Sequence, residues 1–108
     1  MAEVIWTEPA LAELDAIADF IAIHNPVAAH HLVDRVFKHV EHLITHPRSG
    51  PYLRELGRGR YRQIIEPPCR VVYRVSGDTV LVVHVMRTEQ RLRTARLARP
   101  TPRKRAKR

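Results

Sequence analysis

The sequence predicts an α+β fold in the order strand, helix, helix, strand, strand, strand, with a helical hairpin covering the sheet. Two observations lead to this prediction. In the first half of the chain, apolar residues recur at helical spacing after proline-marked helix starts, whereas the second half contains short runs rich in β-branched residues. A length of 108 residues suits one domain with one modest core, which we place at residues 1–98.

The first elements are a strand and two helices. The run EVIWT at residues 3–7 predicts the strand, because it is β-branched and aromatic, and its final threonine followed by Glu-Pro is typical of a helix start. An amphipathic stripe with an acidic outer face predicts a first helix to about Ile23. Asn25 and Pro26 repeat the start signal, and a second stripe continues to Pro47. So short a link predicts a helical hairpin.

Three strands are predicted after a loop. The run PRSGPYLRELGRG, rich in proline and glycine, predicts the loop. Residues 60–66, 70–76 and 79–86 then read as strands, and Gly77 with Asp78 supplies a tight hairpin turn. The last of these strands is apolar at nearly every position, which indicates a central strand covered on at least one face by the helices.

Positive charge is concentrated in the second half of the chain, within a formal net charge of +8. Residues 1–53 carry 3 basic and 7 acidic groups, residues 54–98 carry 10 and 4, and residues 99–108 carry 6 and none. This distribution favours an anionic partner, with nucleic acid ahead of acidic protein or a membrane surface. Residues 89–98 predict a short basic helix, and residues 99–108 predict a disordered tail because they have almost no apolar surface to bury.

Cysteine and histidine usage limits the chemistry that we expect. A single cysteine, Cys69, allows neither an internal disulfide nor a cysteine-rich zinc site. His39, His42 and His46 share one side of the second helix, but no acidic residue or cysteine is placed with them as a fourth zinc ligand. We therefore interpret them as a solvated face and expect no metal and no cofactor.

No membrane association is expected. The chain opens without a basic segment followed by an apolar run, and no stretch approaches the ~20 apolar residues that a membrane span needs. Together with the low cysteine content, these features predict a cytoplasmic protein.

Four segments carry a family resemblance: VIWTEPALAELDAIADFI, LITHPRSGPYLREL, YRQIIEPPCRVVYRV and VLVVHVMR, in this order over roughly residues 3–93. They resemble the ParE/RelE superfamily of toxins from type II toxin–antitoxin systems, also called plasmid stabilisation proteins. The resemblance implies a helical hairpin packed on a small, mainly antiparallel, twisted sheet. It also implies a cognate antitoxin as partner, and is compatible with a toxin dimer or a heterotetramer with the antitoxin.

Two activities occur within the superfamily. RelE-like members resemble ribosome-dependent nucleases that cut mRNA, whereas ParE-like members are associated with inhibition of DNA gyrase. Metal-free RNA cleavage needs a base, an acid and cations at the phosphorus. The resemblance places Arg62, Arg70 and Arg87 as the cations, but residues 88–99 lack the Tyr or His that RelE-like members carry there. The remaining acid–base candidates are Tyr61, Glu66, Tyr73 and His84, of which Tyr73 and His84 are also predicted core residues.

We therefore favour a ParE-like toxin that acts by binding and not as an enzyme. Its surface for the target or antitoxin is predicted to be an exposed basic concavity formed by Arg60, Arg62, Arg70, Arg74 and Arg87. The alternative for these arginines is pairing with Glu55, Glu66 and Glu89 across the sheet. Two other functions stay open: a ribosome-dependent mRNA endoribonuclease with an atypical acid–base set, and a degenerate member that only binds nucleic acid.

Overall fold

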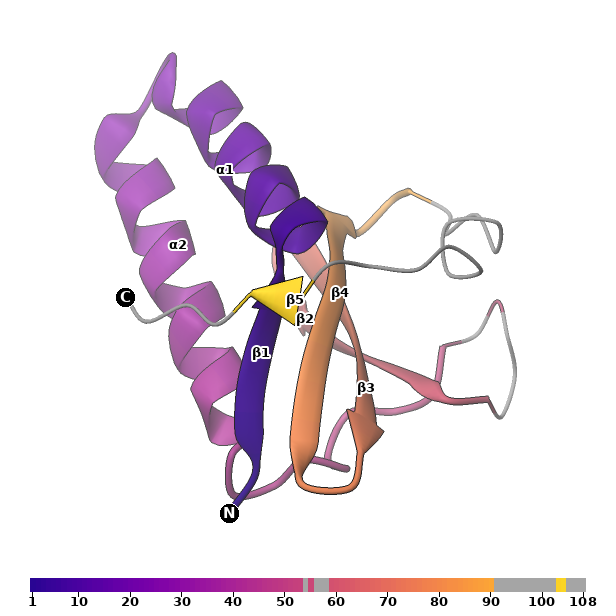
Figure 1. Cartoon of the computed structure of the whole chain (residues 1–108). Coiled ribbons are helices and arrows are strands. Elements are labelled where there is room, and N and C mark those ends of the chain that lie inside the picture. Colours follow the sequence, from indigo (N-terminus) through magenta and orange to yellow (C-terminus); the bar gives the residue numbers. More distant parts are fainter. Residues whose placement is uncertain (54, 56–58, 91–102, 105–108) are drawn as a thin grey trace.

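The computed structural model describes residues 1–53, 55, 59–90 and 103–104, and it shows the predicted α+β fold. A helical hairpin lies against one face of a five-stranded sheet with the order β2-β3-β4-β1-β5 (Figure 1). The elements are β1 (Glu3–Thr7), α1 (Glu8–Ala22), α2 (Pro26–His42), β2 (Tyr61–Glu66), β3 (Cys69–Ser76), β4 (Thr79–Arg87) and β5 (Arg103–Lys104).

Both helices begin where the capping signals predicted. Thr7 ends β1 and caps α1 directly, because its Oγ1 accepts a hydrogen bond from the Ala10 amide at 3.3 Å. The same hydroxyl donates to the Val82 carbonyl at 2.9 Å and so ties the strand–helix junction to β4. At the start of α2, the Asn25 side chain accepts from the Ala28 amide at 3.0 Å. No linker separates β1 from α1, which fixes the direction of the helix over the sheet.

The sheet is mixed, with one parallel pair. β1 runs parallel to β4, whereas β2, β3 and β4 form an antiparallel meander. Gly77 makes the predicted tight turn between β3 and β4 with a φ of 57°, a conformation that glycine adopts without a steric penalty. In β4 the pairing jumps from His84 to Val82, which leaves Val83 as the extra residue of a β-bulge.

Apolar side chains cover both faces of the sheet. The helix-side cluster joins α1 and α2 to residues of the strands, and the second cluster lies on the opposite face. Strand residues of the helix-side cluster are Trp6, Ile64, Cys69, Val71, Tyr73, Val80, Val82 and Val85. The second cluster contains Ile5, Leu53, Val72, Leu81, Val83 and Met86. Alternation along each strand therefore assigns its polar residues to one face or the other.

The C-terminal predictions fall mainly outside the described residues. Of the helix predicted at residues 89–98, only Glu89 and Gln90 are described, and residues 91–98 lie outside. Within the predicted tail, Arg103 and Lys104 form β5, and the other tail residues lie outside the described part. None of the described helices combines the length and apolar composition that crossing a membrane would require.

Candidate functional site

Arg70 is buried and ion-paired, so the prediction that it is exposed is wrong. Only 3% of its surface is accessible. Its Nη2 donates to Glu55 Oε2 at 2.5 Å and lies 3.4 Å from the Met86 sulfur, on the sheet face away from the helices. The loop before β2 brings Glu55 and the fully buried Leu53 onto this face and covers the arginine. Arg70 therefore pairs with Glu55, as in the alternative to an exposed basic surface, and does not offer its charge to a partner.

The predicted arginines do not form one basic surface. The β2–β3 register places Arg62 opposite Tyr73, a helix-side residue, and Arg74 opposite Tyr61, which packs on the second cluster. Arg70 shares that second face with Arg74, because they are four residues apart in β3. The prediction of a single concavity formed by all five arginines is wrong, because strand alternation separates them between the two faces.

The Arg62 guanidinium is hydrogen-bonded to the loop that precedes β2. Its Nη1 donates to the carbonyls of Arg48 and Gly50 at 3.1 and 2.8 Å, and its Nη2 donates to the Tyr52 hydroxyl at 3.0 Å. The guanidinium also lies 4.1 Å from the centre of the Tyr52 ring, within the range of a cation–π contact. These contacts hold the loop against the edge of β2 and leave little donor capacity for a partner.

Arg87 combines positive charge with exposed apolar surface. Its Nε lies 2.8 Å from Glu89 Oε1 in an exposed ion pair, which agrees with the predicted pairing and contributes little energy. The guanidinium lies 5.8 Å from the ring centre of Phe20 in α1. Phe20, Ile23 and Val27 are 61%, 71% and 64% exposed around the end of the helical hairpin. This mixture of a cation and uncovered apolar side chains is typical of a protein contact surface.

The positive charges of Arg60 and Arg74 are not neutralised by any described side chain. Arg60 is exposed and Arg74 is half-buried, and neither makes an ion pair or side-chain hydrogen bond within the described part of the chain. The accessible cations of the predicted set are thus Arg60, Arg74 and Arg87.

The acid–base candidates do not converge on one point. Tyr73 is fully buried, where its hydroxyl accepts from the Gly50 amide at 3.0 Å, and burial raises its pKa. Glu66 is held by α2 and not by a strand arginine, with contacts of 3.1 Å to both Arg35 and His39. Tyr61 lies on the second sheet face, half-buried.

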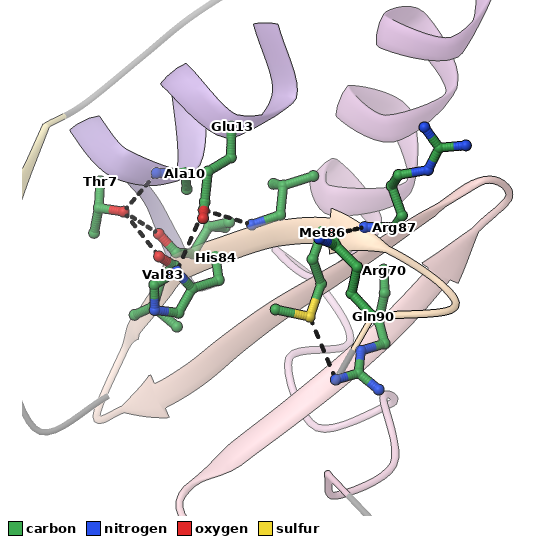
Figure 2. A network of polar contacts seen from close by, with 11 residues as sticks. Thr7, Ala10, Glu13, Arg70, Val83, His84, Met86, Arg87 and Gln90 are labelled. Atoms are coloured by element: carbon green, nitrogen blue, oxygen red, sulfur yellow. Dashed lines mark hydrogen bonds and ion pairs between the residues drawn. The ribbon is translucent and has the colours of Figure 1, made fainter. Parts of the chain in front are cut away.

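His84 is buried in β4 and contacts α1 through Glu13. Its Nδ1 lies 3.3 Å from Glu13 Oε1, and the same oxygen accepts from the Val85 amide at 3.0 Å. Figure 2 shows Glu13 reaching β4 from α1, with Met86 directed to the opposite side of that strand. Because β4 extends beyond its pairing with β1, Glu13 satisfies a strand amide that β1 does not reach. The prediction of a satisfied core histidine holds only in part, since the buried His84 Nε2 has no hydrogen-bond partner among the described residues.

Neither a reactive thiol nor a metal cluster is found in the described residues. Cys69 is fully buried, and burial raises the pKa of its thiol to about 11. No group of at least three His, Cys, Asp or Glu side chains is arranged to hold a metal ion in residues 1–53, 55 and 59–90. Of the three histidines predicted on the second helix, His39 contacts Glu66, while His42 at the end of α2 and His46 beyond it stack with ring centres 4.4 Å apart.

Sequence patterns missed two features of this surface. The buried role of Glu55 was only an alternative, because a loop residue that folds over a sheet has no periodic signal. The exposed apolar side chains of Phe20 and Ile23 could have been found from the sequence, because both lie outside the apolar stripe that faces the core in α1.

The fold and the composition define a small, basic α+β domain in which the accessible Arg74 and Arg87 lie on opposite faces of the sheet. Residues 4–92 match the family described as the ParE toxin of the type II toxin–antitoxin system parDE, and the chain belongs to this family. The chain is therefore the toxin component of a type II system, in which a cognate antitoxin is the partner.

Individual relatives agree with the family assignment. The chain is 34% identical over 89 residues to Toxin RelE2 of Caulobacter vibrioides, covering 79% of this chain and 93% of that protein. A solved chain of the chromosomal ParDE TA system from P. aeruginosa shares 27% identity, with a TM-score of 0.70 over 82% of this chain and 98% of its own length. The toxin resemblance and its implied fold are thus confirmed.

Proposed function

We propose that this toxin is ParE-like and inhibits DNA gyrase by binding to it, without cutting a substrate. The observation that carries the proposal is the separation of the candidate catalytic groups. Tyr73 and Glu66 lie on the helix side of the sheet, whereas Arg70 and Tyr61 lie on the other side. Acid–base catalysis requires the proton donor, the acceptor and the charged groups to surround the same reacting atoms. A binding inhibitor has no such requirement.

The contact residues in this proposal are the accessible arginines. Arg74 and Arg60 offer charged donors without partners among the described residues, and Arg87 offers a charge beside the exposed Phe20 ring. Each charge-assisted hydrogen bond to an acidic group of the target contributes about 1–3 kcal/mol. Arg70 acts indirectly, because it holds Glu55 and the adjoining loop against the sheet.

The antitoxin is proposed to cover part of the same surface. An extended segment or an amphipathic helix with acidic residues would pair with Arg87 and bury the exposed apolar side chains of the hairpin beside it. Covering these residues would prevent contact with the target. Both proposed partners are cytoplasmic, so we also propose a cytoplasmic location.

A gyrase supercoiling assay with the purified protein tests the proposal. We expect inhibition, and Arg74→Ala or Arg87→Ala should raise the half-inhibitory concentration by about tenfold, as expected for a lost charge-assisted contact. Lys38→Ala is the matched control, because Lys38 is exposed on α2, away from this surface, and its loss changes net charge equally. Normal supercoiling at saturating concentrations of folded toxin would refute the proposal.

The alternative function is a ribosome-dependent mRNA endoribonuclease. The 34% sequence identity to Toxin RelE2 is the observation that supports testing it. In this case Tyr61 is the acid–base candidate beside an available cation, because it pairs across the strands with Arg74. Tyr61→Phe would then reduce cleavage of translated mRNA by roughly a hundredfold, and Arg74→Ala would do the same. Discrete cuts in ribosome-bound mRNA, abolished by Tyr61→Phe, would replace the gyrase proposal with this one.

A further inference from the structure

A short segment of the loop before β2, residues 51–53, lies along the outer edge of that strand. Its central residue, Tyr52, forms an antiparallel bridge with Arg62. Because β2 is an end strand in the sheet order, this segment lies at the periphery of the described sheet. Two backbone hydrogen bonds hold it there, from the Gln63 amide to the Pro51 carbonyl at 2.9 Å and from the Leu53 amide to the Tyr61 carbonyl at 3.1 Å.

The bridge fixes the direction of the Tyr52 ring. Residues opposite each other in an antiparallel pair direct their side chains to the same face, where they meet. The Arg62 guanidinium lies 4.1 Å from the ring centre, and its Nη2 donates to the Tyr52 hydroxyl at 3.0 Å. Arg62 therefore covers the ring face that is turned toward β2. The other ring face is turned away from the sheet, and Tyr52 is 39% exposed.

Two arginines beside this ring have unneutralised charges. The guanidinium that holds Tyr52 also binds the Arg48 carbonyl at 3.1 Å, so Arg48 lies close to the ring. Arg60 directly precedes β2, opposite the loop segment. Both side chains are exposed, and neither makes an ion pair or a side-chain hydrogen bond with a described residue. Arg62 itself acts as a positioning residue, because its donors are used within the loop.

Acidic side chains of the neighbouring segments are directed elsewhere. Residues 42–53 contain no aspartate or glutamate. Glu55 pairs with Arg70 on the sheet face away from the helices, whereas the Tyr52 ring shares the helix side with Arg62. Glu66, at the far end of β2, contacts two residues of α2. The local charge beside the exposed ring is therefore positive.

We propose that Tyr52 is a stacking platform for an unpaired base of a single-stranded nucleic acid, with Arg48 and Arg60 binding the adjacent phosphates. Proteins that bind single strands combine cationic side chains along the backbone with aromatic rings on which bases stack. A fixed, accessible ring between unneutralised arginines matches a ligand that has both flat apolar faces and negative charges. Tyr52 and Arg48 are not among the contacts proposed for gyrase, so this site goes beyond that proposal and does not depend on it.

Fluorescence anisotropy with the full chain tests the proposal. The probes are labelled oligo(dT) and oligo(U) of about ten nucleotides, and the reference is an oligomer of equal length and charge with abasic sites in place of the bases. Tyr52→Leu should weaken binding of the base-bearing probes by about tenfold, because it removes the stacking surface, and leave the abasic oligomer unchanged. Tyr52→Phe keeps the ring and should bind within about twofold of the unchanged chain. Thermal unfolding verifies that each variant is folded.

A second variant tests the phosphate contact separately. Arg48→Gln should weaken binding of base-bearing and abasic probes alike, and lower the slope of log affinity against log salt by about 0.7, the value for one phosphate contact of a single strand. Lys38→Gln is the matched control, because it removes the same charge from an exposed position on α2. It should leave the salt slope unchanged.

Three results would overturn the proposal. Unchanged affinity of Tyr52→Leu for both oligo(dT) and oligo(U) would show that no base stacks on the ring. An equal loss for the base-bearing and abasic probes would show that the variant alters the charged surface and not a stacking contact. Binding of an acidic peptide that depends on Tyr52, when oligonucleotide binding does not, would assign the surface to a protein partner.

Discussion

Replacement of Arg70 should destabilise the fold before it affects any partner. The Arg70 side chain is 4% exposed and its partner Glu55 is 14% exposed, with 2.5 Å between the paired atoms. Arg70→Met keeps the length and most of the volume of the side chain but removes the charge, and so leaves the Glu55 carboxylate in a largely water-excluded site. Glu55→Leu creates the opposite case, a buried guanidinium without its carboxylate.

The expected magnitudes follow from burial. Removing one member of a buried ion pair costs about 3–5 kcal/mol, and the greater exposure of Glu55 places Arg70→Met near the lower end, at about 3 kcal/mol. Glu55→Leu should cost about 4 kcal/mol, because Arg70 is the more buried partner and its Nε already lacks a hydrogen-bond partner among the described residues. The double variant removes both charges and should lose only about 1 kcal/mol.

Urea denaturation of the four proteins measures this double-mutant cycle. We expect a coupling energy of at least about 2 kcal/mol between the two sites. Arg74→Met is the matched control, because Arg74 lies on the same strand and face and has no ion pair with any described residue, and it should change stability by less than about 0.5 kcal/mol. Additive effects of the two single variants, or an Arg70→Met protein as stable as the Arg74→Met control, would refute the buried-pair reasoning.

Two further predictions concern buried groups on the helix side. Because burial raises the pKa of Cys69 from 9.0 to about 11, its contribution to stability should be complete below about pH 9 and be lost as pH rises toward 11, by on the order of 2 kcal/mol. Cys69→Ala should flatten this alkaline decline in urea titrations without abolishing it, since the raised pKa of Tyr73 adds a loss above pH 10; an unchanged decline would contradict the assignment. Gly50→Ala should lower the free energy of unfolding by about 1–3 kcal/mol, because the new Cβ would lie 2.5 Å from the Gln63 carbonyl oxygen. Gly77→Ala meets no atom within 4 Å and should cost only about 1 kcal/mol from its positive φ, so a greater loss at Gly77 in thermal unfolding would exclude the steric explanation.

Local signals predicted the helix starts and the β3–β4 turn. Thr7 and Asn25 cap helices through contacts within three residues, and Gly77 acts through its own backbone, so each is visible in a short stretch of sequence. The end of α2 was less predictable. The buried Leu43 continues the apolar stripe after the helix ends at His42, because burial does not require helical backbone.

The candidate site was predictable in composition but not in arrangement. Arg70 and Arg74 were expected to share a surface with Arg62, yet the register of β2 on β3 places Arg62 on the other face. Register depends on pairing between distant residues and on the loop that Arg62 binds, neither of which leaves a period in the sequence. The burial of Arg70 likewise depends on where the loop carrying Glu55 folds.

The position of β4 has a genetic consequence. This strand is the last of the three-strand meander, yet it lies between β3 and β1, and it provides the parallel partner of the first strand in the chain. A polypeptide that stops before Thr79 leaves β1 without its partner and α1 without the carbonyl that holds Thr7. Premature stop codons and frameshifts throughout the first three quarters of the reading frame should therefore yield no folded toxin. Cells that lose the antitoxin consequently have a large mutational target for escape from the toxin.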